Sequence, residues 1–548
     1  MNESNLPLEQ FYSNEINFKD EIYMRQPINS EWKTYTWHEI GQEARILATA
    51  IKNMNFEEKS CIAIMSKNCA HWIITDLAIW MAGHIAVPLY PTLASATINQ
   101  ILTHSESKLV FIGKLDDWES QMSGIPDNIS KVEFPFWKNN GCQPFADFVE
   151  GSRPLENNSN IKADDVATII YTSGTTGTSK GVVHTFDSIS FPMKEAKKRI
   201  DLNENDKFLS YLPLAHIAER LLIEIGSIYS KGEVTFVESL DTFASTLQET
   251  EPTVFLAVPR IWTKFQHGVL KKIPQNKLNL LLIIPIIGNI IKKKIRTQLG
   301  LNNVRIPLTG AAPISKDLLK WFDKIGINIL EVYGMTENFA FATFNFPNCY
   351  KYGSVGKSWE KGEIQIGPNE EIMTRSRGTM KGYYKQPEKT NEVLNQEGWL
   401  MTGDQGAFDE EGFLSITGRV KDLFKTAKGK YISPNLIEKH FAMNSLIEHV
   451  CVVGSGMAYP IALVTLSEIG QAGRNEVIEK SFRLLLDEVN SKVEKFERLK
   501  NIVVIKDEWS VENEVLTPTL KIKRNLIEKN YHLATESWSE SSLPVIFQ

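Results

Sequence analysis

The chain has 548 residues, of which 42% are hydrophobic and 23% are charged, and its formal net charge is −6. A chain of this length exceeds what one hydrophobic core holds, so we expect two or more domains of an ordinary globular protein. The negative net charge does not favour nucleic acid as a partner.

Targeting and cysteine patterns indicate a reducing, cytoplasmic setting. The five cysteines are scattered and show no Cys-x-x-Cys or Cys/His spacing, which argues against a disulfide framework and against a zinc site. The N-terminal stretch lacks the basic and apolar regions of a signal peptide. The longest apolar stretch, residues 278–291, contains Pro285 and Gly288 and is shorter than the roughly 20 residues of a membrane-spanning helix.

The predicted elements change character along the chain. From about residue 35 to 345, short β-rich runs alternate with longer helical segments, which predicts α/β layers with largely parallel sheets. Residues from about 350 to 419 contain short strands and glycine turns, which predict a small β-rich subdomain. The remaining residues, 420–548, contain a strand pair and a long polar helix at 472–498, and predict a small α+β domain.

A polar loop, YTSGTTGTSKG at residues 171–181, follows the strand-like run ADDVATIIY. Glycine backbone N–H groups, hydroxyls and the ammonium of Lys180 are all hydrogen-bond donors, which suits phosphate oxygens. It is not a Walker A loop, because that pattern needs a second glycine five residues after Gly174, where Ser179 stands. The alternative is a flexible polar linker, which needs neither the preceding strand nor the lysine.

Further motifs follow in order: LTGAAP (308–313), EVYGMTE (331–337), GWLMTGD (398–404), GRVKD (418–422) and LTPTLKIKR (516–524). With the polar loop they cover most of the chain, which thereby resembles the adenylate-forming, AMP-binding superfamily and, within it, the long-chain fatty acyl-CoA synthetases. The resemblance implies an ATP- and acyl-binding N-terminal domain, residues 1–419, and a mobile C-terminal domain, residues 420–548. A non-catalytic binding protein is disfavoured because Lys180, Glu337, Asp404, Arg419 and Lys521 are all present.

The resemblance also implies the groups around the phosphates of ATP. Glu337 would hold Mg²⁺ through carboxylate oxygen, and Thr336 would lie beside the α-phosphate. The cradle for the β- and γ-phosphates would consist of Thr172, Ser173, Gly174, Thr175, Thr176, Gly177 and Lys180.

The nucleoside would be bound by other motifs of the same resemblance. Tyr333, followed by Gly334, would lie against the adenine. Asp404 would accept from both ribose hydroxyls, with Arg419 supporting it. The backbone of Gly310, Ala311 and Ala312 would approach the base and the acyl tail.

The C-terminal domain would supply the adenylation lysine. The register of the motif selects Lys521, while Lys523 remains the rival. Lys421 would be the hinge about which the domain rotates between the two half-reactions. The rotation would bring residues 425–431, which begin with Lys425, to a tunnel for the thiol of CoA. Here the chain departs from most relatives, since Ala427-Lys428-Gly429 stands where they have two glycines.

The acid pocket resembles that of fatty acyl-CoA synthetases. At the position where peptide-synthetase domains hold an amino acid's amine with an Asp, this chain reads LPLAHIAER (212–220), and His216 would border the acid and the acyl-AMP. RGTMKGYY and EGWLMTGD resemble the fatty-acid signature, although Met401 replaces a frequent histidine. The implied reaction is ligation of a long-chain fatty acid to CoA, with ATP and Mg²⁺. The alternatives are delivery to an acyl carrier protein, and a medium-chain or aryl acid as substrate.

A basic, apolar segment at residues 271–296 predicts a further contact. No acidic residue lies between Lys264 and Asp317, and lysines flank LNLLLIIPIIGNII. Such flanks suit an anionic membrane surface, which predicts peripheral membrane contact. The alternative is a buried helical hairpin with solvated lysine ends.

Overall fold

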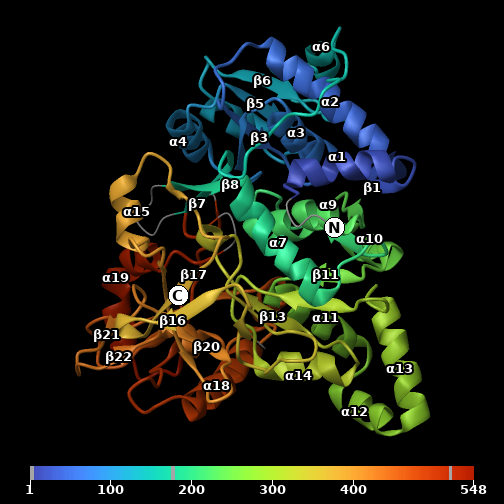
Figure 1. Cartoon of the computed structure of the whole chain (residues 1–548). Coiled ribbons are helices and arrows are strands. Elements are labelled where there is room, and N and C mark those ends of the chain that lie inside the picture. Colours follow the sequence, from blue (N-terminus) through green and yellow to red (C-terminus); the bar gives the residue numbers. More distant parts are fainter. Residues whose placement is uncertain (1–4, 174–178, 443, 512, 518–520) are drawn as a thin grey trace.

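A computed structural model describes residues 5–173, 179–442, 444–511, 513–517 and 521–548. Figure 1 shows two layered α/β units, one at the top of the view in blue and one in green, with the C-terminal block in orange and red beside them. The α/β architecture predicted from the sequence is confirmed. The phosphate-loop residues Gly174, Thr175, Thr176 and Gly177 lie outside the described residues.

The first sheet has seven strands in the order β18-β8-β7-β4-β3-β5-β6. Its central pairs, from β7 through β4, β3 and β5 to β6, are parallel, whereas β7, β8 and β18 pair antiparallel. The described ends of the phosphate loop are the facing ends of β7 and β8. The strands are β3 (Cys61–Met65), β4 (Ile85–Leu89), β5 (Leu109–Ile112), β6 (Ser130–Glu133), β7 (Val166–Ser173), β8 (Ser179–Thr185) and β18 (Gly382–Tyr383).

The second sheet has nine strands in the order β15-β14-β13-β12-β11-β9-β10-β1-β2. Pairing is parallel from β1 to β13 along this order and antiparallel at both edges. The strands are β1 (Ile22–Ile28), β2 (Glu31–Thr36), β9 (Lys207–Ser210), β10 (Glu233–Phe236), β11 (Val254–Leu256), β12 (Ile306–Thr309), β13 (Leu330–Tyr333), β14 (Thr343–Phe344) and β15 (Lys357–Ser358).

Helices cover both sheets, and the buried apolar residues form one large cluster shared by the two sheets and smaller separate clusters beside it. Every residue of α3 (Ala70–Met81) is buried, including Asp76, and the helix is otherwise mostly apolar. The other helices of the first 345 residues are α1 (Pro7–Asn17), α2 (Trp37–Asn53), α4 (Ser95–Ser105), α5 (Trp118–Gln121), η1 (Met122–Gly124), α6 (Phe145–Val149), α7 (Phe186–Ile200), α8 (Ile217–Glu219), η2 (Arg220–Ile225), α9 (Gly226–Ser230), α10 (Phe243–Thr250), α11 (Pro259–Lys272), α12 (Gln275–Ile283), α13 (Pro285–Gln298), α14 (Lys316–Lys324) and η3 (Thr336–Asn338).

A small antiparallel sheet follows, in the order β16-β17-β19-β20. It fits the β-rich texture predicted from about residue 350, and it carries the GWLMTGD and GRVKD motifs on adjacent strands. Its elements are β16 (Glu363–Ile366), η4 (Pro368–Glu370), β17 (Glu371–Arg375), α15 (Pro387–Val393), β19 (Leu400–Phe408) and β20 (Leu414–Arg419).

The C-terminal block is α+β, and its boundary at residue 420 stays a prediction. The predicted strand pair is β23 (Ile447–Val453) against β24 (Ile461–Leu466), and β25 (Ile502–Val504) and β26 (Val545–Phe547) extend that sheet in parallel. The remaining elements are β21 (Phe424–Lys425), β22 (Tyr431–Ile432), α16 (Pro434–Glu438), α17 (Glu468–Gln471), α18 (Asn475–Lys492) and α19 (Arg524–Glu540).

The helix predicted at 472–498 is shorter, spanning Asn475–Lys492. Gly473 lies in the turn before it, where its N–H donates to the carbonyl of Gly470. At the other end, the Asn490 side chain donates to the carbonyl of Leu499 and accepts from its N–H, at 2.9 and 2.8 Å. This pair of hydrogen bonds turns the chain back and ends the helix, a tertiary contact that helical periodicity does not reveal.

The segment 271–296 forms a helical hairpin, α12 and α13, which lies at the outer edge of the molecule in Figure 1. Pro285 begins α13, which explains why the apolar run breaks there. The hairpin is not buried, since Ile283 and Ile286 are 75% and 77% exposed. Among the described residues, no helix has the length and apolar character needed to cross a bilayer.

Candidate active site

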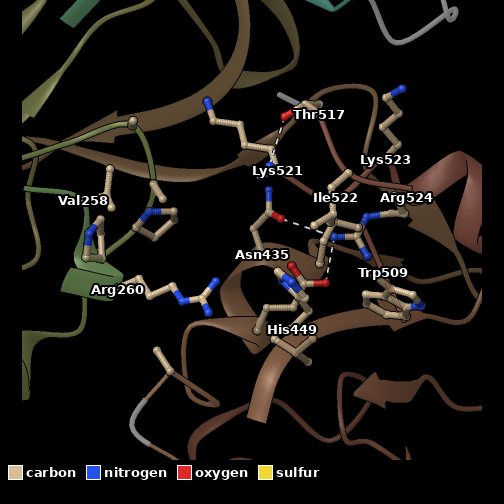
Figure 2. A pocket seen from close by; sticks show the side chains of 18 of the residues that line it. Val258, Arg260, Asn435, His449, Trp509, Thr517, Lys521, Ile522, Lys523 and Arg524 are labelled. Carbon is tan, nitrogen blue, oxygen red and sulfur yellow. Dashed lines mark hydrogen bonds and ion pairs between the residues drawn. The ribbon is translucent and has the colours of Figure 1, made fainter. Parts of the chain in front are cut away.

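A cleft of about 2990 Å³ lies between the two α/β units, the small sheet and the C-terminal block. In Figure 2, Val258 and Arg260 lie on one wall and Asn435 and His449 on the opposite wall. The cleft brings together residues from every motif except the undescribed part of the phosphate loop. The predicted site residues that line it are Thr172, His216, Gly310, Ala311, Ala312, Tyr333, Gly334, Thr336, Glu337, Asp404, Arg419, Lys421, Lys425 and Lys521.

Asp404 accepts two hydrogen bonds from residues of different sheets. The Tyr333 hydroxyl at the end of β13 donates to Oδ2 at 2.8 Å, and Arg419 Nε donates to Oδ1 at 2.7 Å. Asp404 and Arg419 are direct partners in the β19–β20 register, which explains the second contact. The charge of Asp404 raises the pKa of Arg419, while burial first and then that charge raise the pKa of Tyr333. A carboxylate has about four acceptor positions, so Asp404 retains capacity for a ligand hydroxyl.

Glu337 lies in η3, close to β8 and β18. Its Oε1 accepts from the Tyr383 hydroxyl at 2.8 Å, and its backbone carbonyl accepts from the N–H of Met380. Burial raises the pKa of the Glu337 carboxyl, and the hydrogen bond from Tyr383 partly offsets this rise. The preceding carbonyl, of Thr336, accepts from His184 Nε2 at 2.7 Å. Burial lowers the pKa of His184 to about 4, which keeps this ring neutral.

The residues present fit a magnesium ion held mainly by substrate. Within the described ranges, no group of three or more His, Cys, Asp or Glu side chains could by itself hold a metal ion. Mg²⁺ prefers oxygen ligands, keeps several waters, and is often bound through one carboxylate and substrate phosphates. Glu337 offers such a carboxylate at the edge of the cleft.

Lys180 lies at the start of β8, beside rather than in the lining of the cleft. Its ammonium lies 4.8 Å from the centre of the Tyr383 ring. Partial burial, followed by repulsion from Lys389 and Lys421, lowers its pKa. A lysine crowded by other cations gains from a bound anion, as expected beside a phosphate site.

Lys521 reaches the cleft from the C-terminal block. Its backbone is fixed by Thr517, which accepts from the Lys521 N–H at 3.0 Å and donates its own N–H to the Lys521 carbonyl at 2.8 Å. Lys521 is an exposed residue, but the cleft walls partly desolvate its ammonium and lower its pKa, and the charge of Arg419 lowers that pKa further. Lys523 also lines the cleft, yet the two lysine side chains extend in different directions in Figure 2.

His216 caps the short helix α8. Its Nδ1 accepts from the N–H of Ala218 at 3.2 Å, so Nε2 carries the ring proton in the neutral form. Burial, with a further contribution from the charge of Lys521, lowers its pKa to about 4. The turn is anchored by Glu219, which accepts from Asn68 and from the N–H of Tyr211. His216 is therefore a neutral N–H donor at neutral pH.

Two motif glycines are required by close approach. A Cβ at Gly334 would lie 2.5 Å from the backbone of Ala340, and one at Gly310 would lie 2.8 Å from the Val332 side chain. Ala311 has a φ of 65°, an uncommon conformation for a residue with a Cβ. The LTGAAP loop thus presents tightly packed backbone, rather than bulky side chains, to the cleft.

The residues predicted for the second half-reaction lie on the C-terminal side of the cleft. Lys425 belongs to the hairpin β21–β22, and its ammonium lies 5.6 Å from the Tyr431 ring centre. Gly429 adopts a φ of 80° in the turn of this hairpin. The chain thus lacks the two glycines that most relatives have in this loop, but it keeps a glycine at the position whose positive φ favours one.

Sequence reasoning missed Glu331, which lines the cleft two residues before Tyr333. It is 8% exposed, and its Oε2 has no hydrogen-bond partner among the described residues. Burial raises its pKa to about 8. Strand alternation was the available signal, because residues i and i+2 share a face. Tyr383 and His184 were also missed, since their contacts join distant segments.

Arg220 ends the LPLAHIAER motif but points away from the cleft. Its guanidinium is fully buried, where it pairs with Asp76 and, at 3.0 Å, with Glu224. It also lies near the rings of Trp72 and Trp80. A buried charge needs such partners, so Arg220 contributes to the core beneath the motif.

Comparison with known proteins agrees with this geometry. The family model "AMP-binding enzyme" matches residues 16–384, and "AMP-binding enzyme C-terminal domain" matches residues 421–538. The long-chain-fatty-acid–CoA ligase ACSBG2 of Xenopus laevis is 26% identical, covering 98% of this chain and 84% of that protein. Long-chain-fatty-acid–CoA ligase 5 of Rattus norvegicus is 29% identical, with 94% and 86% covered. FadD15, a long-chain-fatty-acid–CoA ligase of Mycobacterium tuberculosis, is 25% identical, with 95% and 94% covered.

Solved structures share the fold. The anthranilate CoA ligase AuaEII in complex with anthranoyl-AMP has a TM-score of 0.80 at 20% identity, with 98% of this chain and 99% of that chain covered. The adenylation domain of a carboxylate reductase from Mycobacterium chelonae has a TM-score of 0.82 at 19% identity, with 98% and 92% covered. The chain therefore belongs to the AMP-binding, adenylate-forming family of enzymes, whose CoA ligases use ATP, Mg²⁺ and CoA.

Proposed function

We propose that the protein joins a long-chain fatty acid to CoA through an acyl adenylate. The observation that carries this proposal is the convergence of Lys521, Glu337 and Asp404 on one cleft from three separate parts of the chain. In the first half-reaction, a carboxylate oxygen of the acid attacks the α-phosphorus of ATP. The bond to the β-phosphate oxygen breaks, and pyrophosphate leaves with the electron pair.

Both reactants are anions, so the protein's main task is to neutralise charge. Lys521 places an ammonium near the carboxylate and the α-phosphate. Thr336 lies on the α-phosphate side, and Lys180 with residues 172–177 holds the β- and γ-phosphates. Mg²⁺, when bound through Glu337, supplies charge neutralisation at the phosphates. His216 directs its Nε2–H toward the carboxylate, which fixes the reacting oxygen.

The nucleoside lies against the Tyr333–Asp404–Arg419 group in this account. Asp404 accepts from the ribose hydroxyls while Tyr333 and Arg419 hold its carboxylate in place. The backbone of Gly310 to Ala312 approaches the base. Glu331, on the strand face that carries Tyr333, would pair its carboxyl with the Watson–Crick edge of adenine. The neutral acid offers one acceptor and one donor, matching the exocyclic amine and N1.

In the second half-reaction, the thiol of CoA attacks the acyl carbonyl and AMP leaves. We propose that residues 420–548 rotate about Lys421 between the two steps, which would withdraw Lys521. The hairpin with Lys425, at residues 425–431, would then face the thiol channel. A phosphopantetheine thiol on an acyl carrier protein would use the same surfaces and is the alternative acceptor.

A long acyl chain is supported by the cleft wall and by the relatives. The cleft is lined by the apolar side chains of Leu89, Leu93, Ile101, Ile217 and Leu256. Each buried methylene contributes ~0.8 kcal/mol, so an apolar wall favours long chains cumulatively. The curated relatives named above are long-chain-fatty-acid–CoA ligases.

The test is pyrophosphate release over straight-chain acids of increasing length and over aryl acids, each with and without CoA. Release that rises with chain length and yields acyl-CoA is expected. Preference for a medium-chain or aryl acid would reject the substrate, whereas adenylation followed by transfer only to a carrier protein would reject the acceptor. Absence of acid-dependent release with every acid would reject adenylation itself.

We also propose a cytoplasmic protein that contacts membranes through the hairpin α12–α13. Leu280, Ile283, Ile286 and Ile290 are 65%, 75%, 77% and 62% exposed, which places a cluster of large aliphatic side chains in solvent. The flanking charges of the 271–296 segment are all positive: Lys271, Lys272, Lys277, Lys292, Lys293, Lys294 and Arg296. Aliphatic insertion with lysines near anionic headgroups suits a bilayer surface, and each lysine contributes about 1 kcal/mol there.

Flotation with anionic liposomes tests this contact. The double variant Ile283→Ser/Ile286→Ser should float less than wild type, while Leu533→Ser, at a still more exposed position on α19, should float normally. Flotation that is unchanged in the double variant would reject the hairpin as the contact surface.

A further inference from the structure

Tyr383 lies between the two groups that the proposed mechanism assigns to the leaving pyrophosphate. Its hydroxyl donates to Oε1 of Glu337 at 2.8 Å, and its ring lies 4.8 Å from the ammonium of Lys180. These three side chains come from β18, η3 and β8 respectively. One buried side chain thus contacts both the carboxylate and the lysine.

The backbone around Tyr383 fixes the position of its ring. Tyr383 pairs with Val182 in the β18–β8 ladder, and the N–H of Tyr384 donates to the carbonyl of Gly181 at 2.7 Å. On the other side, the N–H of Met380 donates to the carbonyl of Glu337 at 2.8 Å. The segment 380–384 therefore binds both β8 and the Glu337 turn, which sets the hydroxyl before any ligand enters.

A neutral donor suits this place for an electrostatic reason. An arginine or lysine on Glu337 would form an ion pair and compete with a cation for the carboxylate. A tyrosine hydroxyl orients one carboxylate oxygen and leaves the negative charge of the group in place. The aromatic face meanwhile attracts the Lys180 ammonium without donating a counter-charge.

We propose that Tyr383 is a positioning residue for the magnesium–nucleotide complex. Its hydroxyl sets the orientation of the Glu337 carboxylate, and its ring holds Lys180 toward the leaving phosphates. This inference rests on the proposed function, because it takes Glu337 as the metal-binding carboxylate. Tyr383 of the KGYY sequence, which is distant from Glu337 and Lys180 along the chain, thereby belongs to the phosphate side of the site.

Tyr383→Phe removes the hydroxyl and keeps the ring, so it separates the two contacts. A hydrogen bond to a charged group is worth enough to change binding by roughly 10-fold. In this variant, the Mg²⁺ concentration that half-saturates acid-dependent ATP–pyrophosphate exchange should rise about 10-fold. Calorimetry should show weaker ATP binding with Mg²⁺ present and unchanged ATP binding with EDTA, a readout that does not depend on turnover.

Tyr384→Phe is the matched control. Tyr384 is the next residue, and its ring packs against His104 on the opposite face of the strand. The Tyr384→Phe variant also loses a tyrosine hydroxyl, but one that does not contact Glu337. The Mg²⁺ concentration that this variant needs for half-saturation should therefore match wild type. Thermal unfolding of all variants confirms that they are folded.

Glu337→Gln distinguishes failure of the inference from failure of the proposed function. If Glu337→Gln raises the Mg²⁺ requirement and Tyr383→Phe leaves it within twofold of wild type, the role of Tyr383 is rejected alone. An equal rise in Tyr384→Phe would also reject it. If Glu337→Gln leaves the Mg²⁺ dependence unchanged, the metal role proposed for Glu337 is rejected together with the inference.

Discussion

The Tyr333 hydroxyl donates to Asp404 Oδ2 across 2.8 Å and thereby joins β13 of the nine-stranded sheet to β19 of the small antiparallel sheet. The proposed nucleoside site is thus shared by two sheets that are distant along the chain. The geometry of this site depends on how the small sheet packs against β13. Substitution of Tyr333 or Asp404 is therefore expected to weaken ATP binding while the residues that contact the phosphates stay in place.

Glu331 gives a prediction about pH. Burial raises its pKa to about 8, so the carboxyl is neutral below that pH and can donate to adenine N1. As the pH rises through 8 the donor is lost, and the KM for ATP should increase. Glu331→Gln carries a permanent donor and acceptor, so its KM for ATP should stay flat over the same range. Glu249→Gln, an exposed change on α10, should behave as wild type. An alkaline rise that persists in Glu331→Gln would contradict the assignment.

Lys521 and Lys523 are distinguished by the half-reactions. Lys521→Met should reduce acid-dependent ATP–pyrophosphate exchange by roughly 100-fold or more, because a charge-stabilising group is lost. Thioester formation from supplied acyl-AMP should persist, since the proposed rotation would withdraw Lys521 in that step. Lys523→Met is the control and should retain exchange. An active Lys521→Met beside an inactive Lys523→Met would reverse the assignment.

The ion pair between Arg260 on α11 and Glu448 on β23 connects the N-terminal part to the C-terminal block. We expect this pair to stabilise the arrangement in which Lys521 faces the cleft. Glu448→Gln should therefore lower the rate of pyrophosphate exchange several-fold and leave the rate of thioester formation from acyl-AMP unchanged or raised. The charge-swapped pair Arg260→Glu/Glu448→Arg should recover exchange relative to either single swap. Equal loss in both half-reactions would indicate a structural effect instead.

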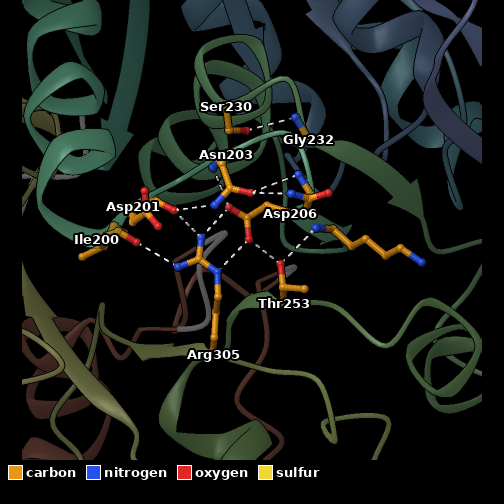
Figure 3. A network of polar contacts seen from close by, with 10 residues as sticks. Ile200, Asp201, Asn203, Asp206, Ser230, Gly232, Thr253 and Arg305 are labelled. Atoms are coloured by element: carbon orange, nitrogen blue, oxygen red, sulfur yellow. Dashed lines mark hydrogen bonds and ion pairs between the residues drawn. The ribbon is translucent and has the colours of Figure 1, made fainter.

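Figure 3 shows a polar network outside the motifs, centred on Asp206. Arg305 Nε donates to Asp206 Oδ1 at 2.9 Å, and Thr253 Oγ1 donates to the same oxygen at 2.6 Å. Asp206 is only 2% exposed, so Arg305→Ala leaves a buried carboxylate without its cation and should cost about 3 kcal/mol of unfolding free energy.

Chemical denaturation measures that cost. The control, Arg483→Ala, breaks an exposed pair with Glu479 on α18 and should cost less than about 1 kcal/mol. Exchange activity per folded molecule should stay normal in Arg305→Ala, and loss of activity without loss of stability would contradict a purely structural role.

His184 predicts how stability depends on pH. Its pKa is lowered to about 4 in the folded protein, whereas an unfolded histidine titrates near 6.5. Between these values the unfolded chain binds more protons, so stability falls as the pH drops, by about 3 kcal/mol in total. His184→Gln should flatten part of that slope in denaturant titrations from pH 7 to pH 4. A His184 ring that titrates near 6.5 in the folded protein would contradict this.

Local patterns were sufficient for much of the fold. The β-branched run before the phosphate loop becomes β7, and the glycine turns after residue 350 become the small antiparallel sheet. Which residues gather at the cleft was implied by the resemblance of the ordered motifs to the AMP-binding superfamily, and not by local patterns. Strand alternation in EVY could also have indicated Glu331.

Contacts between distant segments could not be predicted in this way. Tyr383 reaches Glu337 only because β18 pairs with β8, some two hundred positions earlier, and no local signal encodes that pairing. The Arg260–Glu448 pair likewise joins segments that are distant along the chain, so no local pattern indicates it. In α12–α13 the break at Pro285 was readable, but the sequence left a surface-exposed and a buried hairpin open, because lysine flanks indicate a surface and apolar residues ordinarily indicate burial; the exposure of Ile283 and Ile286 excludes the buried alternative.

The central claim is that the acid's own oxygen attacks the α-phosphorus. It is tested most directly by turnover of a long-chain fatty acid with both carboxyl oxygens labelled with ¹⁸O, followed by mass spectrometry of the products. The account predicts that AMP gains one labelled oxygen per turnover, that pyrophosphate gains none, and that acyl-CoA retains the other. Label in inorganic phosphate or pyrophosphate, or unlabelled AMP beside labelled acyl-CoA, would contradict it.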